Sequence, residues 1–221
     1  MSKVGKVITV DGPAASGKTS VSRGLARHLG WKWVSTGAFY RGLAYVAQEL
    51  GIPTSDKESL IKLSCSKEWK IELDEDLTRV LFRNHDVTKN IAAQKVGELA
   101  SQISQIPEIR KELLEAQRSC AQDVVGLVAE GRDCGTVVFP SALFKVYLTA
   151  DSDARAQRRA DEQGQSAEAI KASQSQRDHL DSTRKVAPLQ AATDAYIVDT
   201  SNLTLPQVVD KIIKKIDEMG L

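Results

Sequence analysis

The chain has 221 residues, 42% of them hydrophobic, which suits one large α/β domain or a core with small insertions. Its 30 lysines and arginines nearly balance its 29 aspartates and glutamates, which argues against a general binder of nucleic acids or membrane surfaces. Its 3 cysteines form no CxxC pair, and we find neither a signal peptide nor a run long enough to span a membrane. We therefore expect a cytoplasmic, monomeric protein without a disulfide framework and without a nucleic-acid or membrane partner.

Apolar periodicity and turn signals predict strands that alternate with helices along most of the chain. The expected order is a strand at 5–11, a helix at 18–29, a strand at 31–34, helices at 36–50 and 55–66, a β hairpin or meander at 69–87, helices at 91–104 and 107–123, strands at 126–129 and 144–148, helices at 152–163 and 166–185, a strand at 196–198 and a helix at 205–218. The hairpin is indicated by period-two alternation on both sides of an acidic turn at 74–76. The fold class is α/β, with a parallel five-stranded sheet between helical layers and ligands at the carboxyl ends of its strands.

The first strand leads into GPAASGKTS, residues 12–20, which has the spacing of a phosphate-binding loop. Such a loop wraps a phosphate with successive backbone N–H groups, and the helix that follows adds its positive N-terminal end. Lys18 would reach the β- and γ-phosphates, and Thr19 would offer its hydroxyl to Mg²⁺. A small-residue turn before a helix is the alternative, but the flanking strand and helix favour the phosphate loop. The expected ATP contacts are Gly12, Pro13, Ala14, Ala15, Ser16, Gly17, Lys18, Thr19 and Ser20.

Two charged clusters follow the carboxyl ends of other predicted strands. In the stretch 35–41, Thr36 can cap a helix and Arg41 lies in its second turn; a capped helix with a solvated arginine is the plain alternative. In the stretch 130–133, an apolar strand ends in charged residues, and packing of a hydrophobic core does not explain charges at that position. There Gly131 would let the backbone turn close to a ligand, and Arg132 could clamp a phosphate. An Arg–Asp pair at a sheet edge is the alternative for this cluster.

Two arginine stripes lie later in the chain. Arg177, Asp181 and Arg184 share one helix face, and Arg155, Arg158 and Arg159 form a similar stripe upstream. Either stripe alone could be a solvated surface of little energetic value. A nucleoside triphosphate and a monophosphate together carry roughly six negative charges, of which Mg²⁺ offsets about two. The remainder could be neutralised by Lys18, Arg41, Arg132, Arg158, Arg177 and Arg184. Phosphoryl transfer requires this positioning and charge neutralisation, and we interpret all three histidines as structural or surface residues.

Five motifs, in chain order, resemble the bacterial cytidylate kinases: GPAASGKT, STGAFYR, ASQIS followed by PEIR, EGRDCGTVVFP, and RDHLD followed by RKVAPL. The resemblance covers nearly the whole chain and implies a three-layer P-loop nucleoside monophosphate kinase fold in a single domain, 1–221. It implies a core of 1–35, 124–150 and 187–221, a monophosphate-binding lobe at 36–123 with a small β insertion at about 67–90, and a lid at about 151–186. Ser35 replaces a frequent aspartate of the family, and Leu180 and Ser182 lie where extra arginines are common.

The resemblance also implies transfer of the γ-phosphoryl group of ATP, with Mg²⁺, to CMP or dCMP. The implied catalytic residues are Lys18, Arg132 and Arg158, the last on the lid, and Thr19 is the implied metal ligand. The implied substrate-binding residues are Thr36, Arg41, Ser101, Arg110, Arg132, Asp133, Arg177, Asp181 and Arg184. Chemistry supports one of these roles, because the Asp133 carboxylate can accept from the exocyclic amino group of cytosine, where uracil has a carbonyl.

Three other functions were weighed against this hypothesis. A GTP-dependent switch would use the DxxG-like segment at 123–126, but no guanine-reading NKxD follows it. A different small-molecule kinase could act on UMP, AMP or a sugar, although the number of arginines favours an acceptor that already carries phosphate. A structural or scaffolding role would leave the charges at the strand ends unexplained.

Overall fold

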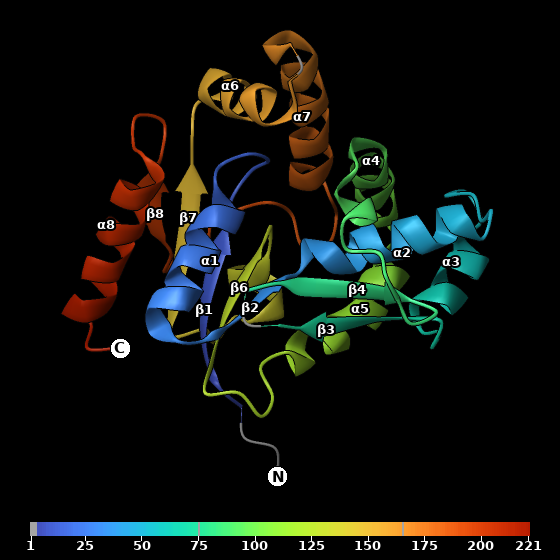
Figure 1. The fold of residues 1–221 in the computed structure, drawn as a ribbon, viewed down its shortest axis with the longest axis horizontal. Coiled ribbons are helices and arrows are strands. Elements are labelled where there is room, and N and C mark those ends of the chain that lie inside the picture. The colour runs from blue at the N-terminus through green and yellow to red at the C-terminus, as the bar shows by residue number, and fades with distance from the viewer. Residues whose placement is uncertain (1–3, 75, 165) are drawn as a thin grey trace.

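The structure, a computed structural model, describes residues 4–74, 76–164 and 166–221 and contains two β-sheets with helices around them (Figure 1). Its elements are β1 (Lys6–Asp11), α1 (Lys18–Leu29), β2 (Lys32–Ser35), α2 (Gly37–Glu49), α3 (Lys57–Ser64), β3 (Trp69–Leu73), β4 (Thr78–Phe82), β5 (His85–Asp86), η1 (Asn90–Ala92), α4 (Gln94–Ile103), α5 (Pro107–Ser119), β6 (Gly126–Gly131), η2 (Cys134–Val138), β7 (Phe144–Thr149), α6 (Ser152–Gln163), α7 (Ala167–Ser182), β8 (Tyr196–Asp199) and α8 (Leu205–Glu218).

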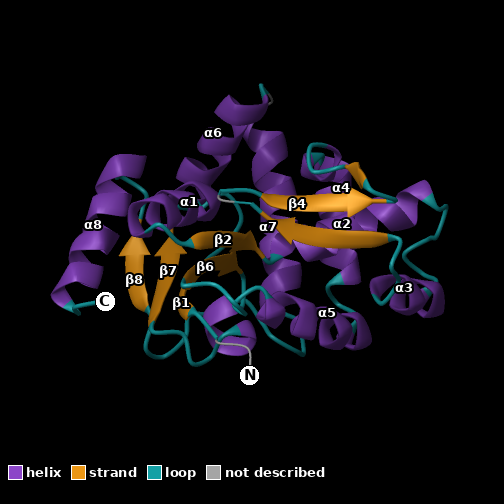
Figure 2. Ribbon diagram, turned by 60° about the horizontal axis from the view of Figure 1, so that its bottom comes forward, coloured by secondary structure: helices purple, strands orange, loops and turns teal. Residues whose placement is uncertain are grey.

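The main sheet has five strands in the order β2-β6-β1-β7-β8, and every neighbouring pair is parallel. This confirms the predicted parallel sheet between helical layers. Val7 and Ile8 are neighbours on β1 but belong to different core clusters, because successive side chains of a strand point to opposite faces. One cluster includes Leu43 of α2, and the other includes Leu25 of α1, so helices cover both faces (Figure 2).

The register of the main sheet brings the carboxyl ends of β1, β2 and β6 together. Asp11, the last residue of β1, lies opposite Gly131 of β6, and Ser35 of β2 lies opposite Glu130. The phosphate-loop segment after β1 and the charged segments after β2 and β6 therefore leave the sheet at the same edge, as expected for parallel strands.

The small sheet is antiparallel, in the order β3-β4-β5, and confirms the predicted hairpin or meander. Of the predicted acidic turn, Glu75 lies outside the described residues. Asp76 at this turn forms ion pairs with Arg23 (3.2 Å) and with Arg27 of α1. The tip of the small sheet is therefore joined to the helix that follows the phosphate loop.

Helix boundaries differ from the predictions at three places. The predicted helix at 91–104 is divided, because Ala93 has φ −55° and ψ 143° between η1 and α4. The helix predicted at 107–123 ends at Ser119, and the one predicted at 166–185 ends at Ser182, so Arg184 follows the helix. The π-helical turn η2 was not predicted.

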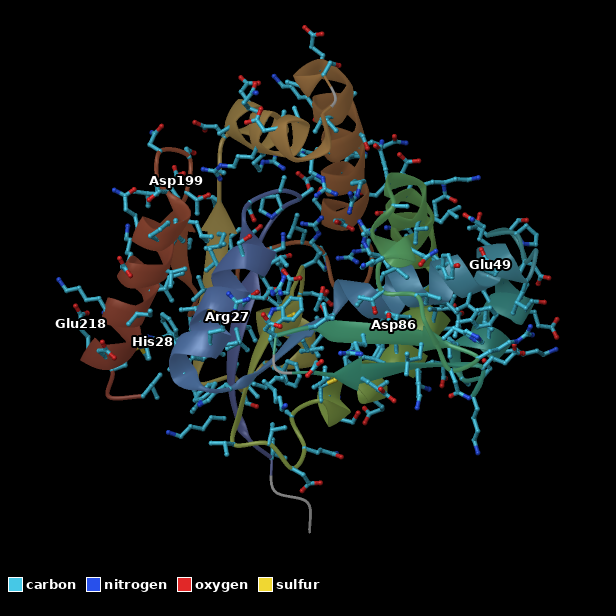
Figure 3. The ribbon with its side chains drawn as sticks, viewed as in Figure 1. Arg27, His28, Glu49, Asp86, Asp199 and Glu218 are labelled. Carbon is cyan, nitrogen blue, oxygen red and sulfur yellow. The ribbon has the colours of Figure 1, made fainter. Side chains whose placement is uncertain are left out.

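The exposure of the histidines agrees with their interpretation as structural or surface residues. All three histidines are exposed, and Figure 3 shows His28 at the outer side of α1, together with charged residues such as Arg27. The three cysteines are free thiols. Within the described ranges, no helix has the length and apolarity that crossing a membrane would require.

Candidate active site

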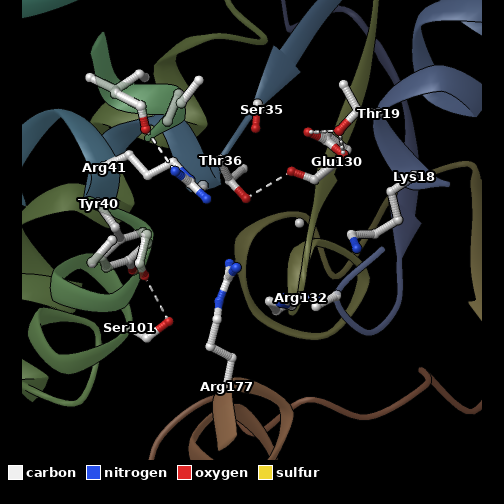
Figure 4. A pocket seen from close by; sticks show the side chains of 18 of the residues that line it. Lys18, Thr19, Ser35, Thr36, Tyr40, Arg41, Ser101, Glu130, Arg132 and Arg177 are labelled. Atoms are coloured by element: carbon white, nitrogen blue, oxygen red, sulfur yellow. Dashed lines mark hydrogen bonds between the residues drawn. The ribbon is translucent and has the colours of Figure 1, made fainter. Parts of the chain in front are cut away.

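A cavity of about 460 Å³ lies at the carboxyl edge of the main sheet. It is lined by side chains that the sequence placed in separate clusters, and many of them point into it (Figure 4). Its predicted residues are Ala14, Ala15, Lys18, Thr19, Thr36, Arg41, Ser101, Arg132, Asp133, Arg177, Asp181 and Arg184. The structure therefore brings segments from across the chain to one site. The predicted residues that do not line the cavity are Arg110, Arg158 and, in the phosphate loop, Gly12, Pro13, Ser16, Gly17 and Ser20.

The phosphate loop turns into α1 at Gly17, whose φ of 87° lies in the left-handed region that favours glycine. Lys18, the first residue of α1, donates from Nζ to the carbonyl oxygen of Pro13 at 2.6 Å. Burial and the nearby Arg132 charge lower the pKa of Lys18 to about 7, and the Glu130 carboxylate opposes that shift. The loop therefore holds its amine in place at the floor of the cavity.

Thr19 and Glu130 form a cluster of oxygen atoms beside this lysine. The Thr19 hydroxyl contacts both carboxylate oxygens of Glu130, at 3.0 and 3.1 Å, and Glu130 is buried. Hydroxyl and carboxylate oxygens are hard donors of the kind Mg²⁺ prefers, and the ion usually completes its shell with water and substrate phosphates. These residues fit a magnesium ion shared with a nucleotide. The described residues hold no cluster of three His, Cys, Asp or Glu side chains that could bind a metal alone.

Thr36 occupies the N-cap position of α2, as the sequence predicts, but its side chain makes no capping hydrogen bond. Its hydroxyl donates instead to the carbonyl oxygen of Glu130 at 2.9 Å, which joins the ends of β2 and β6. This bond also explains Gly131, because a Cβ there would lie 2.3 Å from the Thr36 hydroxyl and 2.6 Å from the Cys134 sulfur. Gly131 is thus required by packing against these two residues, whereas the sequence suggested close approach to a ligand.

Asp11 fixes the turn that follows β6. Its carboxylate accepts backbone N–H bonds from Cys134 at 2.9 Å and from Gly135 at 2.7 Å. Burial raises the pKa of Asp11 to about 6, although the two N–H donors favour the ionised form. The residue that ends β1 and precedes the phosphate loop therefore also holds the segment after Arg132 and Asp133.

Arg41, Arg132 and Arg177 converge on the cavity from three different elements (Figure 4). Arg41 donates to the carbonyl oxygen of Ile91 at 2.7 Å, and it passes so close to Gly97 that a Cβ there would lie 2.6 Å from Nη2. Burial, and then the charges of Arg177, Arg159 and Arg132, lower the pKa of Arg41 to about 10.

Arg177 and Arg132, together with Arg41, form a cationic wall of the cavity. Arg177 reaches into the cavity from α7, and its buried Nε has no hydrogen-bond partner among the described residues. Arg132 pairs with Asp181 through Nε at 2.8 Å and donates to the Gly12 carbonyl oxygen at 2.6 Å. Like charges held this close repel one another, so the wall is suited to an anion that would pair with several of them.

A buried network lies deeper in the site. Arg110 pairs with Asp133 at 2.5 Å, and its guanidinium lies 5.4 Å from the centre of the Tyr40 ring. Arg184 and Asp181 are also buried, so the alternative of a solvated surface ladder for Arg177, Asp181 and Arg184 is wrong. Burial raises the pKa of Asp133, and the Arg110 charge opposes this shift. Arg110 Nη1 and Arg184 Nη2 have no partner among the described residues, which leaves donors available to a polar ligand.

Arg158 lies away from the cavity in this conformation. It donates to the Thr200 hydroxyl at 3.1 Å and also bonds the Thr200 carbonyl oxygen. Its neighbour Arg159 lines the cavity, and so does Tyr40; neither was singled out from the sequence as a site residue. Tyr40 stands inside the STGAFYR motif, which is the signal that could have indicated it.

Comparisons with known proteins agree with this geometry. The family profile for cytidylate kinase matches residues 8–218. A cytidylate kinase from Bdellovibrio bacteriovorus is 57% identical over 96% of this chain and 97% of its own length, and one from Mycolicibacterium paratuberculosis is 40% identical over 93% and 92%. A gluconokinase structure from Sinorhizobium meliloti shares only the fold, with 15% identity, a TM-score of 0.53 and coverage of 98% of this chain and 94% of that one. Sequence similarity over almost the entire length, together with a phosphate loop that faces a wall of arginines, shows that the chain belongs to the cytidylate kinase family.

Proposed function

We propose that this protein transfers the γ-phosphoryl group of ATP to CMP or dCMP and releases ADP with CDP or dCDP. The observation that carries this proposal is the position of Arg41 and Arg177 across a single cavity from Lys18, with Arg132 beside the phosphate loop, where it donates to the Gly12 carbonyl oxygen. Two phosphate-bearing nucleotides repel each other, and fixed cations between them make their approach favourable. Membership of the cytidylate kinase family supports the same reaction.

The acceptor would bind on the side of the buried network. Arg41, Arg132 and Arg177 would hold its phosphate, and Asp181 would bind the sugar hydroxyls. Thr36, Ser101, Arg110, Asp133 and Arg184 would complete the substrate site, with the last four facing cytosine. A uracil carbonyl opposite the Asp133 carboxylate would leave a buried acceptor unpaired, which costs about 1–3 kcal/mol.

The donor would bind along residues 12–20, with Lys18 at its β- and γ-phosphates. Thr19, with Glu130 beside it, would hold Mg²⁺, which supplies charge neutralisation on the phosphates when it is bound. We propose that the helix pair α6–α7, within about 151–186, is the lid, and that 36–123 is the monophosphate lobe on a core of 1–35, 124–150 and 187–221. Arg158 could then meet the phosphoryl group only after it leaves Thr200. A cytoplasmic monomer is part of this proposal.

A panel of acceptors tests the proposal. We expect ADP release from ATP with CMP and dCMP, and rates at least about tenfold lower with UMP or AMP. Uracil presents a carbonyl where cytosine presents its amino group to Asp133, and the larger purine of AMP would place its amino group elsewhere in the site. A coupled ADP-release assay at one enzyme concentration measures all four. Equal rates with AMP would rule out the cytosine assignment, and phosphorylation of gluconate in place of CMP would favour the sugar kinases that share the fold.

The pKa of Lys18 predicts a pH dependence of ATP binding. Without a nucleotide this pKa is about 7, so the amine is mainly neutral above pH 7 and must gain a proton when phosphates restore its usual higher pKa. We expect uptake of about one proton at about pH 8.5, no uptake below about pH 6, and an affinity that falls by up to about tenfold per pH unit between these limits. Calorimetry in buffers of different ionisation enthalpy measures the uptake, and its absence at high pH would contradict the shift.

A further inference from the structure

The α6–α7 pair contacts the phosphate loop through a residue that the sequence did not indicate. The Asp178 carboxylate of α7 accepts the backbone N–H of Ala14 at 2.8 Å. Arg155 of α6 donates to the carbonyl oxygen of the same Ala14 at 2.9 Å and pairs with Asp178 at 2.5 Å. Both side chains are mostly buried, with 17% exposure for Asp178 and 12% for Arg155. The helix pair therefore binds both backbone groups of one loop residue, the N–H and the carbonyl oxygen of Ala14.

A second contact holds the same helix pair on the other side of the loop. Arg158 of α6 donates to the Thr200 hydroxyl at 3.1 Å, and that hydroxyl lies 3.4 Å from the Ser16 carbonyl oxygen as its donor. Figure 1 shows α6 and α7 above the end of β1 and the start of α1, where the loop runs. The arginines of α6 thus bind protein carbonyl groups at two points around the loop.

The charge of Asp178 gives this contact a functional meaning. Backbone N–H groups of a phosphate loop attract anionic oxygens, and a carboxylate is such an anion. The phosphates of a triphosphate would need the Ala14 N–H that this carboxylate occupies, so Asp178, together with the Arg155 paired to it, would have to move away before they could bind. We propose that Asp178 acts as an internal anion that occupies the Ala14 N–H and lowers the affinity for the donor until the helix pair moves. The inference rests on the proposed function, because it takes the loop to be the ATP site.

Asp178 does not occupy the proposed binding site of the acceptor nucleotide. Asp178 does not line the cavity, whereas the predicted acceptor residues Arg41, Asp133 and Arg184 do. A change at Asp178 should therefore alter the affinity for ATP and leave that for CMP nearly constant. This selectivity separates a competing anion from a residue that merely supports the fold, since general loosening would weaken both nucleotides.

The test measures binding of a non-hydrolysable ATP analogue with Mg²⁺, and of CMP, to Asp178→Asn and Asp178→Ala. Asparagine keeps the shape and an oxygen for Ala14 but removes the charge, and alanine removes both. Asp153→Asn is the matched control, because Asp153 pairs with Lys171 across the same two helices at 2.5 Å and is 82% exposed. We expect both Asp178 variants to bind the analogue roughly three- to tenfold more tightly, since apparent affinity scales with the fraction of competent protein. The CMP affinity should stay within about twofold in all three variants.

Two results would overturn the inference: analogue affinity that is unchanged or weaker in both Asp178 variants, or an equal gain in Asp153→Asn. Failure of the proposed function would look different, because the unmodified protein would then bind no ATP analogue or would not phosphorylate CMP. An unmodified protein that does both, beside Asp178 variants that bind the analogue no better, would discard only the role of Asp178.

Discussion

Replacing Arg132 with alanine is expected to lower kcat/KM for CMP by about 10²–10³-fold, the loss typical of removing one preorganised charge-stabilising donor. Arg132 lies where the phosphate loop, β6 and α7 meet, because it binds both the Gly12 carbonyl and Asp181. Its loss would remove a cation from between the two phosphates of the proposed complex. Among the described residues, the buried Asp181 would keep Arg184, at 3.9 Å, as its charged partner. Coupled ADP release under saturating ATP measures this effect.

Arg132→Lys is the informative companion to the alanine variant. Lysine restores the charge but not the planar fork that reaches Asp181 and Gly12 together, so we expect only partial recovery. Near-normal turnover in Arg132→Ala, with an unchanged thermal midpoint, would show that this guanidinium is not needed at the transferring phosphoryl group.

Arg110→Ala is expected to lower the free energy of unfolding by about 3–5 kcal/mol, because it leaves the Asp133 carboxylate buried without its partner. The two side chains are each 8% exposed, and Asp133 has no compensating access to water. Urea unfolding followed by circular dichroism measures the change. The same variant should raise KM for CMP more than KM for ATP, since the pair lies on the proposed acceptor side.

Arg79→Ala is the matched control for a lost ion pair. Arg79 pairs with Asp74 at 2.7 Å on the small sheet, but the two side chains are 44% and 46% exposed. Exposed pairs contribute about 0–1 kcal/mol, so the control should remain close to the unmodified protein. If Arg110→Ala were as mild as this control, the buried pair would not be the stabilising element that its geometry indicates.

Local patterns predicted the parts of the fold and of the cavity that depend on neighbours in sequence. The main sheet followed from short apolar runs such as that ending at Asp11, and the segments at the strand ends followed from charges placed directly after them. Parallel strands bring their carboxyl ends to one edge regardless of loop details, so Lys18, Arg41 and Arg132 were expected to share a site before any contact was known.

Tertiary contacts determined what local patterns could not. Thr36 has the sequence signature of a helix cap, yet the Glu130 carbonyl on a neighbouring strand is the partner that it binds. The choice between Arg158 and Arg159 depends on how α6 is rotated, and this is set by Ala156 and Ala160 packing toward α7. Neighbouring residues on a helix point about 100° apart, so a sequence motif alone cannot say which of the two faces the cavity.

The two hydrogen bonds that Asp11 accepts from Cys134 and Gly135 have a consequence for how accurately two reactants can be aligned. The strand that leads into the phosphate loop ends in the same carboxylate that anchors the turn after Arg132 and Asp133, more than a hundred residues later in the chain. Thermal motion of the phosphate loop would therefore be coupled to motion of the turn at Cys134 and Gly135. The distance between the attacking and the leaving oxygen would then vary little. If the two nucleotides bind as proposed, this backbone connection would set much of the alignment between the donor and acceptor phosphates.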